Sequence, residues 1–293
     1  MQDKDNGIFN RKRVSVRDIV TMKQKLEKIS VLTAYDYSTA LICDRAGVDV
    51  LLVGDSAAMV MLGYPTTNQI NMEEMLTFCS GVSRGVKRAM IIADMPFGSY
   101  QISTGEAITN AIKFIKVGCH AVKLEGGLEI IDTVKAIVKT GIPVMGHIGL
   151  KPQTTILSEG YRLQGKTKIS GLKLIEDAKA LEEAGVFSIV LEMVTSEVAD
   201  IICKNISIPT IGIGSGSSCD GQVLVLHDML GIYDDIKPKF VKRYAEVSKS
   251  IFEAVSVYIS DVKSSKFPNE ENIFHTSPAD LEQIKQTLKE KKI

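Results

Sequence analysis

The chain lacks an excess of charge of either sign, and it lacks any long apolar run. Its 293 residues include 35 Lys plus Arg and 35 Asp plus Glu, so nothing favours a polyanionic partner such as nucleic acid, and a small-molecule substrate is expected. No apolar run reaches the ~18 residues of a membrane span, and the polar start MQDKDNGIFNRKR lacks the apolar stretch of a signal peptide. We therefore expect a cytoplasmic protein with no membrane partner.

Cysteine pairs of the Cys-x-x-Cys type are absent as well. The five cysteines are odd in number and scattered, so the sequence suggests neither a zinc site nor a redox pair of that type. Each is expected to be a small buried residue in a reducing compartment. They are Cys43, Cys79, Cys119, Cys203 and Cys219.

The residues that are present fit a single barrel. Hydrophobic residues make up 45% of the chain and charged residues 24%, a balance that allows a full core. The length is slightly above the ~250 residues typical of a (β/α)8 barrel. We expect one catalytic domain over 1–293, with the barrel core at about 16–262, a short N-terminal extension and a peripheral helical tail at 276–293.

Eight short apolar runs rich in β-branched residues recur along the chain, with helical patterns between most of them. Such runs are typical of parallel strands that are buried on both faces. A doubly wound open sheet is the main alternative, but eight strands in this length favour closure into a (β/α)8 TIM barrel. The expected strands are 30–35, 48–54, 89–95, 120–125, 142–148, 187–193, 208–214 and 223–229, and the expected helices are 36–46, 72–88, 104–117, 128–139, 171–184, 196–205 and 238–260.

Two connections are longer than the few residues usual between such elements. They are GDSAAMVMLGYPTTNQIN after the second expected strand and GLKPQTTILSEGYRLQGKTK after the fifth. Both follow the carboxyl ends of strands, the face on which barrels of this kind carry their active sites. The last part of the chain turns polar and is expected to end in a charged helix from about Pro278.

Acidic residues end two neighbouring expected strands. Asp55 follows a glycine in LLVGDS, where a lone aspartate can equally be a turn or cap residue. Asp94 has the corresponding place in IIADMPFG. Two carboxylates that reach one rim from neighbouring strands repel each other unless a cation or a proton lies between them. Together they indicate a metal site.

The fourth and fifth expected strands also carry ionisable side chains near their ends. Lys123 and Glu125 in VKLEGG are two residues apart and therefore project from one face of the strand. If that face is inward, both reach the barrel mouth; a structural ion pair is the alternative, because buried charges need partners. His147 ends the next strand in VMGHIG, where a single histidine can be purely structural.

Glu192 lies near the end of the sixth expected strand, in SIVLEMV. Apolar neighbours disfavour its charged form, which suits a general base, although a buried and paired glutamate is the alternative. A set of carboxylates without clustered His or Cys favours a hard ion, Mg²⁺ first. A metal with open positions can bind a 2-oxo acid and acidify the adjacent C–H, so enolate chemistry is expected.

The glycine-rich segment GIGSGSSCDGQ follows the seventh expected strand. It reads G-x-G-x-G and lacks the third glycine at the spacing of a dinucleotide-binding fingerprint. We expect either a loop that contacts the substrate or a plain turn.

Six segments of the chain form a set, and they are LTAYDYSTA, DVLLVGDSAAMVMLGYPTT, IIADMPFGSYQIS, AVKLEGG, VMGHIGLKPQ and PTIGIGSGSSCDGQVLVLHDMLGI. Taken together they resemble the ketopantoate hydroxymethyltransferase family, also called the 3-methyl-2-oxobutanoate hydroxymethyltransferases, of the phosphoenolpyruvate/pyruvate barrel superfamily. The resemblance runs from about Val16 to His275, and the strings GDS, ADMPFGSY, KLEGG and GHIGLKPQ are specific to that family in combination.

The resemblance implies transfer of a hydroxymethyl group from 5,10-methylenetetrahydrofolate to 3-methyl-2-oxobutanoate, which gives 2-dehydropantoate for pantothenate biosynthesis through a Mg²⁺-stabilised enolate. By position, Asp55 and Asp94 would bind the metal directly, and Glu125 would bind its coordination shell through water. Glu192 would be the catalytic base. A homo-oligomer, typically a decamer, is also implied. The residues implied to bind the substrate are Asp55, Ser56, Asp94, Lys123 and His147.

Two alternatives to this function stay open. A Mg²⁺-dependent oxo-acid lyase or phosphoenolpyruvate mutase of the same superfamily would carry a Lys-Lys-Cys-Gly-His type signature, and the chain has no such string. A sensor barrel that only binds a ligand would lack a base or a metal ligand, whereas each of those positions is filled here. About ten extra residues at the amino end and the tail after His275 depart from the family's usual pattern, and neither carries an expected site residue.

Overall fold

The computed structural model describes residues 12–155, 162–233 and 238–291. The chain divides into two compact units, Met1–Tyr244 and Ala245–Ile293. The first unit contains the barrel and the second contains the C-terminal helices. Among the described residues, no helix is both long enough and apolar enough to cross a membrane.

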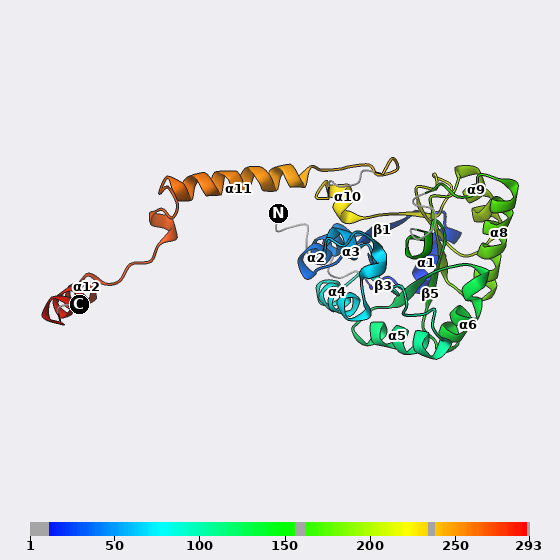
Figure 1. Ribbon diagram of the computed structural model, residues 1–293, viewed down its shortest axis with the longest axis horizontal. Helices are drawn as coiled ribbons and strands as arrows, with labels where there is room; N and C mark the ends of the chain where they lie inside the picture. Colours follow the sequence, from blue (N-terminus) through cyan, green and yellow to red (C-terminus); the bar gives the residue numbers. More distant parts are fainter. Residues whose placement is uncertain (1–11, 156–161, 234–237, 292–293) are drawn as a thin grey trace. The chain divides into compact units, whose positions relative to one another are not determined.

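The first unit is a closed barrel of parallel strands that pair in chain order, with the last strand beside the first (Figure 1). This confirms the predicted (β/α)8 TIM barrel. Several strands are buried along their whole length, because inward residues fill the barrel and outward residues pack under helices. The strands are β1 Ile29–Thr33, β2 Val50–Val53, β3 Met90–Asp94, β4 Ala121–Glu125, β5 Val144–Gly149, β6 Ser188–Glu192, β7 Thr210–Ile213 and β8 Gly221–Leu224.

Helices on the outside of the barrel cover the strands, and their starts are encoded locally (Figure 1). Asp36 caps α2 by accepting hydrogen bonds from the amides of Ser38 and Thr39. Asn71 and Glu74 form a reciprocal capping box at the start of α4. The outer helices are α2 Tyr37–Ala46, α4 Met72–Gly85, α5 Thr104–Lys116, α6 Ile131–Lys139 with the 3₁₀ turn Leu128–Ile130 before it, α8 Lys168–Glu183 and α9 Ser196–Asn205.

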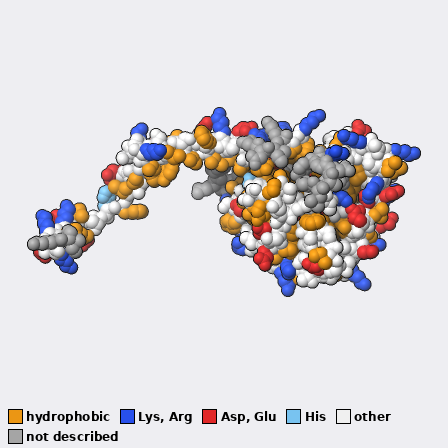
Figure 2. Space-filling view, viewed as in Figure 1, with side chains coloured by type: hydrophobic (Ala, Val, Ile, Leu, Met, Phe, Trp, Pro, Cys, Tyr) orange, Lys and Arg blue, Asp and Glu red, His pale blue; other side chains and the backbone are white. Residues whose placement is uncertain are grey.

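The two long connections carry short helical segments above the carboxyl ends of the strands. The loop after β2 contains α3 Ala57–Val60 and the 3₁₀ turn Thr67–Gln69, and the loop after β5 contains α7 Pro152–Thr155. Part of the second loop, 156–161, lies outside the described residues, as do the first eleven residues of the N-terminal extension. Figure 2 shows acidic and basic side chains interspersed over the visible face of the barrel, in line with the balanced charge.

The sequence did not predict helix α1, Val16–Gln24. Its Ile19 is 1% exposed and belongs to the apolar cluster inside the barrel, together with Ile29 and Met90 at the starts of β1 and β3. This helix therefore packs against the amino-terminal end of the barrel, opposite the ends of the strands that carry the acidic residues.

The predicted eighth strand, 223–229, was placed too late. The observed strand is Gly221–Leu224, and the same apolar run continues into helix α10, Leu226–Leu230. A side chain at Gly221 would meet the Ile29 carbonyl oxygen at 2.4 Å, so β8 begins where only glycine fits beside β1. Strand pairing stops at Leu224, and the amide of Leu226 donates to the Thr33 hydroxyl (3.0 Å).

The last barrel-associated helix was predicted at 238–260, within a core that extends to about 262. The structure instead has helix α11 at Val247–Lys263, and this helix belongs to the second unit and buries none of its residues. The compact barrel unit ends earlier, at Tyr244. The second unit continues through the 3₁₀ turn Glu270–Asn272 to α12, Pro278–Lys291, which begins at the predicted residue.

Candidate active site

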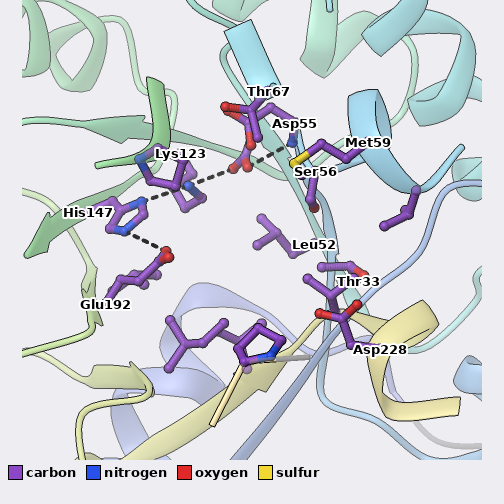
Figure 3. Close-up of a pocket in the computed structure, with 18 of the residues that line it drawn as sticks. Thr33, Leu52, Asp55, Ser56, Met59, Thr67, Lys123, His147, Glu192 and Asp228 are labelled. Carbon is purple, nitrogen blue, oxygen red and sulfur yellow. Dashed lines mark hydrogen bonds and ion pairs between the residues drawn. The ribbon is translucent and has the colours of Figure 1, made fainter. Parts of the chain in front are cut away.

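A cavity of about 270 Å³ lies at the carboxyl ends of the barrel strands (Figure 3). It has one wall rich in ionisable groups, contributed by β2 to β6, and a facing wall that is mainly apolar. The structure brings to this one pocket all the residues proposed from the sequence, which are Asp55, Ser56, Asp94, Lys123, Glu125, His147 and Glu192.

Strand register places the central ion pair. Asp94 of β3 lies beside Lys123 of β4, and the Lys123 Nζ is 3.1 Å from the Asp94 Oδ1. Each side chain is only 4% exposed. Burial alone would lower the pKa of Lys123, but the carboxylates of Asp94, Glu125 and Asp55 outweigh it and raise the pKa. Lys123 is therefore a fixed positive charge in the pocket wall.

The two aspartates expected to bind a metal lie against each other. The backbone amide of Asp55 donates to the Asp94 Oδ2 (3.1 Å). Burial, followed by the negative charges of Asp94 and Glu125, raises the pKa of Asp55 well above its usual range. Burial also raises the pKa of Asp94, although Lys123 opposes the rise.

Gln153, in the loop after β5, donates hydrogen bonds to two of the acidic residues. No sequence pattern identified it as a site residue. Its side-chain NH₂ donates to the Asp55 Oδ2 (2.8 Å), and its backbone N–H donates to the Glu125 Oε2 (3.0 Å). The oxygen of its side-chain amide, Oε1, accepts from the Tyr100 hydroxyl (2.8 Å). The sequence offers only a weak signal for this role, because Gln153 lies in GHIGLKPQ and Tyr100 in ADMPFGSY, both within the family-like segments.

His147 links two carboxylates across the pocket. Its Nδ1 is 3.5 Å from the Glu125 Oε1, and its Nε2 is 3.2 Å from the Glu192 Oε2. The Lys123 Nζ is also 3.1 Å from Nδ1, so this nitrogen faces both an ammonium group and a carboxylate. Burial and the Lys123 charge act against protonation, but the contacts with Glu125 and Glu192 outweigh them and raise the pKa of His147 to about 9. The contact with Glu192 needs a proton on Nε2, whereas Nδ1 can accept from the Lys123 ammonium group or donate to Glu125.

Two further groups complete the polar wall. The Ser56 hydroxyl lies 2.8 Å from the Tyr35 hydroxyl, which is buried behind it. Glu192 ends β6, and its side chain is 15% exposed, more than the 1% of Glu125. Glu192 is thus the carboxylate of this cluster that a pocket ligand reaches with less obstruction, and His147 fixes its orientation (Figure 3).

The charges of this cluster fit a divalent cation. Four carboxylates face Lys123 and His147, so full ionisation would leave an excess of at least two negative charges whichever form the His147 ring takes. Within the described ranges, no three His, Cys, Asp or Glu side chains already surround one point as a metal site. The fit rests on the donors themselves: Asp55, Asp94 and Glu125 are buried in one pocket and supply oxygen ligands.

Fold and pocket together define a class, a (β/α)8 barrel with a pocket of ionisable groups at the carboxyl ends of its strands, the face on which such barrels carry their active sites. The profile of the family described as Ketopantoate hydroxymethyltransferase matches residues 13–270. The chain belongs to the ketopantoate hydroxymethyltransferase family, a family of transferases, and the resemblance found in the sequence is confirmed.

Individual relatives agree with this assignment. The 3-methyl-2-oxobutanoate hydroxymethyltransferase of Nitrosopumilus maritimus is 57% identical over 274 residues, which cover 94% of this chain and 98% of the relative. The enzyme of the same name from Carboxydothermus hydrogenoformans is 53% identical over 273 residues, covering 93% and 99%. These relatives match nearly their full length.

Solved structures with similar folds are much more distant in sequence. A phosphonopyruvate hydrolase matches with a TM-score of 0.60 at 11% identity, covering 95% of this chain and 97% of the other. A 2,3-dimethylmalate lyase, described as a member of the PEP mutase/isocitrate lyase superfamily, matches with a TM-score of 0.56 at 14% identity, covering 94% and 96%. At such identities the likeness shows the fold alone.

Proposed function

We propose that the protein transfers a hydroxymethyl group from 5,10-methylenetetrahydrofolate to 3-methyl-2-oxobutanoate, giving 2-dehydropantoate and tetrahydrofolate. The observation that carries the proposal is the row formed by Lys123, His147 and Glu192, in which a buried cation and an oriented carboxylate lie on either side of one imidazole ring. Such a row can stabilise a substrate anion and accept a proton within the same pocket. Family membership supports the choice of substrates.

Asp55, Asp94 and Glu125 are the residues that would hold Mg²⁺. When bound, the ion polarises the 2-oxo group and makes the neighbouring C3–H more acidic. Gln153 keeps Asp55 and Glu125 in place through its side-chain and backbone N–H groups. Outer hydrogen bonds of this kind orient metal ligands.

Lys123 and Ser56 bind and orient the oxo acid. The Lys123 ammonium group supplies a fixed positive charge for the negative charge that develops on the 2-oxo oxygen as the C3 proton leaves. The Ser56 hydroxyl, held by Tyr35, offers a hydrogen bond to the same anion. The buried position of Lys123 excludes water from its ammonium group and strengthens its interaction with the substrate.

Glu192 accepts the proton from C3. Its carboxylate is held by the His147 Nε2, which keeps it in one orientation toward the pocket. The resulting enolate attacks the one-carbon unit and forms the new carbon–carbon bond. When the folate is the donor, water supplies the hydroxyl oxygen of the product, and tetrahydrofolate leaves.

The test is formation of 2-dehydropantoate from 3-methyl-2-oxobutanoate and 5,10-methylenetetrahydrofolate in the presence of Mg²⁺. We expect stoichiometric tetrahydrofolate and 2-dehydropantoate. Cleavage of the oxo acid without consumption of the folate would favour a lyase of the superfamily instead. Binding of the oxo acid with neither reaction would favour a sensor barrel.

We further propose a cytoplasmic homo-oligomer, with the catalytic groups confined to the barrel unit. The resemblance to the family is the support for a decamer. In addition, α11 exposes several large apolar side chains, which a single chain leaves in contact with water; they include Ile251, Phe252, Val255 and Tyr258. Light scattering coupled to size-exclusion chromatography tests the assembly, and a monomer at micromolar concentration would contradict it.

A further inference from the structure

Asp228 is an ionisable pocket residue that the mechanism above does not use. It lies in the first turn of α10 and lines the pocket beside Thr33, across from Glu192 (Figure 3). Among the described residues, its carboxylate makes no hydrogen bond and no ion pair. Burial raises the pKa of Asp228 to about 6, although the positive charge of Arg243 opposes the rise. A half-buried carboxylate without a partner, facing a cavity, calls for a ligand that donates hydrogen bonds.

Apolar side chains that suit a flat ring line the same pocket. They include Met59 and Val60 of α3, Val225 just before α10, and Phe240. A carboxylate at the edge of an apolar surface is the combination that binds a planar heterocycle by stacking and by hydrogen bonds to its edge.

The oxo acid cannot be the partner of Asp228. Its carboxylate and carbonyl oxygens only accept hydrogen bonds, so it matches the Lys123 wall and would be repelled by a second carboxylate. The other reactant of the proposed function, a reduced pterin that carries the one-carbon unit, presents a 2-amino group and an adjacent ring N–H. These two donors match the two oxygens of one carboxylate.

We propose that Asp228 binds the aminopyrimidine edge of the one-carbon carrier and so positions the carrier's one-carbon unit opposite Glu192. This inference rests on the proposed function and deepens it by assigning each reactant to one wall of the pocket. The oxo acid occupies the wall of Lys123, and the pterin ring lies against the wall of Asp228 and Phe240. Asp228 is a binding residue here, and the proton transfer stays with Glu192.

The test compares two one-carbon donors in an Asp228→Asn variant. With 5,10-methylenetetrahydrofolate, KM for the donor is expected to rise about 10- to 100-fold, because one charge-assisted contact is lost and another is weakened. With formaldehyde, which has no pterin ring, the relative loss in kcat/KM is expected to be much smaller. Since burial disfavours the charged form of Asp228, the variant should not unfold at a lower temperature.

Each result separates this inference from the proposed function. An unchanged KM for the folate, or equal losses with both donors, would overturn the role of Asp228 while leaving the reaction intact. Failure of the unmodified protein to make 2-dehydropantoate from either donor would instead overturn the proposed function. Binding of tetrahydrofolate alone, measured by calorimetry, should weaken in the variant by a similar factor.

A second, independent observation concerns two cysteines that are distant in the sequence. Cys203 of α9 and Cys219, in the loop before β8, have their sulfur atoms 3.9 Å apart. The Cys203 Sγ also lies 3.1 Å from the Thr210 hydroxyl. The hydrogen bond with Cys219, supported by Thr210, lowers the pKa of Cys203 to about 7 against the effect of burial. Cys203 is partly exposed, whereas Cys219 is 1% exposed.

We infer that Cys203 and Cys219 form a disulfide when the protein meets a hydroperoxide. The Cys203 thiolate attacks one peroxide oxygen, the O–O bond breaks, and hydroxide leaves, so Cys203 becomes a sulfenic acid. The Cys219 sulfur then attacks the Cys203 sulfur, the S–O bond breaks, and water leaves with the Cys219 proton. In total, two thiols are oxidised by two electrons and the peroxide is reduced to water.

Peptide mass spectrometry under non-reducing conditions tests this pair. After mild treatment with hydrogen peroxide, we expect a linked Cys203–Cys219 peptide that a dithiol reductant removes. The buried pair Cys79 and Cys119, 0% and 3% exposed, is the internal control and should stay reduced. Sulfinic acid at Cys203 without the linked peptide, or the same linkage rate for every cysteine, would overturn the inference. In a Cys219→Ser variant, Cys203 should instead accumulate as the sulfenic acid.

Discussion

The two walls of the pocket differ in what holds them. On the wall from β2 to β6, buried charges are connected to one another, as Lys123 to Asp94 and His147 to Glu192. On the facing wall, residues from β1, β7, β8 and the segment after α10 pack mainly through apolar contacts, and Asp228 is the exception. The two walls are therefore expected to have different roles. A substitution on the charged wall should alter the reaction, and a substitution on the apolar wall should alter which molecule binds.

The largest effect is expected for Glu192→Gln on the charged wall. Glutamine keeps the size of the side chain but cannot accept the C3 proton, so kcat should fall roughly 10³-fold, within the range for loss of a general base. KM for the oxo acid should change little, as steady-state kinetics would show. The exposed Glu197→Gln on α9 is the matched control and should retain full activity. A Glu192→Gln enzyme with more than a tenth of the activity would reassign the base.

A smaller but still large effect is expected for Asp94→Asn. The change removes the negative charge of a proposed metal ligand, which is also the partner of Lys123, while keeping the shape of the side chain. The Mg²⁺ concentration that gives half-maximal activity should rise at least on the order of 100-fold, the upper range for changes in a metal's outer shell. A metal titration of activity measures this, and circular dichroism checks the fold. An unchanged metal requirement would remove Asp94 from the metal site.

Gln153→Ala should have an intermediate effect, because it removes a support and no direct ligand. Loss of its side-chain contacts with Asp55 and Tyr100 should weaken the affinity for Mg²⁺ by roughly 10-fold. Calorimetric Mg²⁺ titration measures the change. The control is Gln286→Ala on the exposed helix α12. Equal affinity in the Gln153 variant would mean that the loop after β5 does not organise the acidic residues.

The smallest effect is expected on the apolar wall, for Phe240→Leu. This change keeps an apolar surface of similar kind, and such substitutions usually cost less than about 1.5 kcal/mol. KM for the substrates should rise by a small factor while kcat stays near its original value. A loss in kcat as large as that of Glu192→Gln would contradict the assignment of the reaction to the charged wall and of substrate binding to the apolar wall.

The sequence predicted the barrel well because apolar runs on both strand faces are a strong signal. It also predicted that Asp94, Lys123 and His147 meet at one rim of the barrel, since each lies near the carboxyl end of a strand. The run 223–229 was assigned to a strand, because a short apolar run does not distinguish a strand from a buried helix turn. The helix predicted at 238–260 is present but begins later, at Val247, and its amphipathic pattern does not reveal that it belongs to the second compact unit.

Sequence patterns could not predict the side-chain contacts that orient the residues of the site. Gln153 lies in a loop without periodicity, and its side chain reaches Asp55 from 98 residues away. The paired contacts of His147 depend on the register that sets Glu125 beside it, which no local pattern specifies. The place of Asp228 in the pocket lining is visible only once α10 replaces the end of the predicted strand.

The central claim is that the charged wall removes a proton from C3 of a 2-oxo acid before any one-carbon unit is needed. The direct measurement is hydrogen exchange at C3 of 3-methyl-2-oxobutanoate in deuterated water, with protein and Mg²⁺ but without folate, followed by NMR. We predict that the C3 signal disappears at a rate proportional to the protein concentration, and that Glu192→Gln abolishes this exchange. No exchange by folded, Mg²⁺-saturated protein would contradict the account.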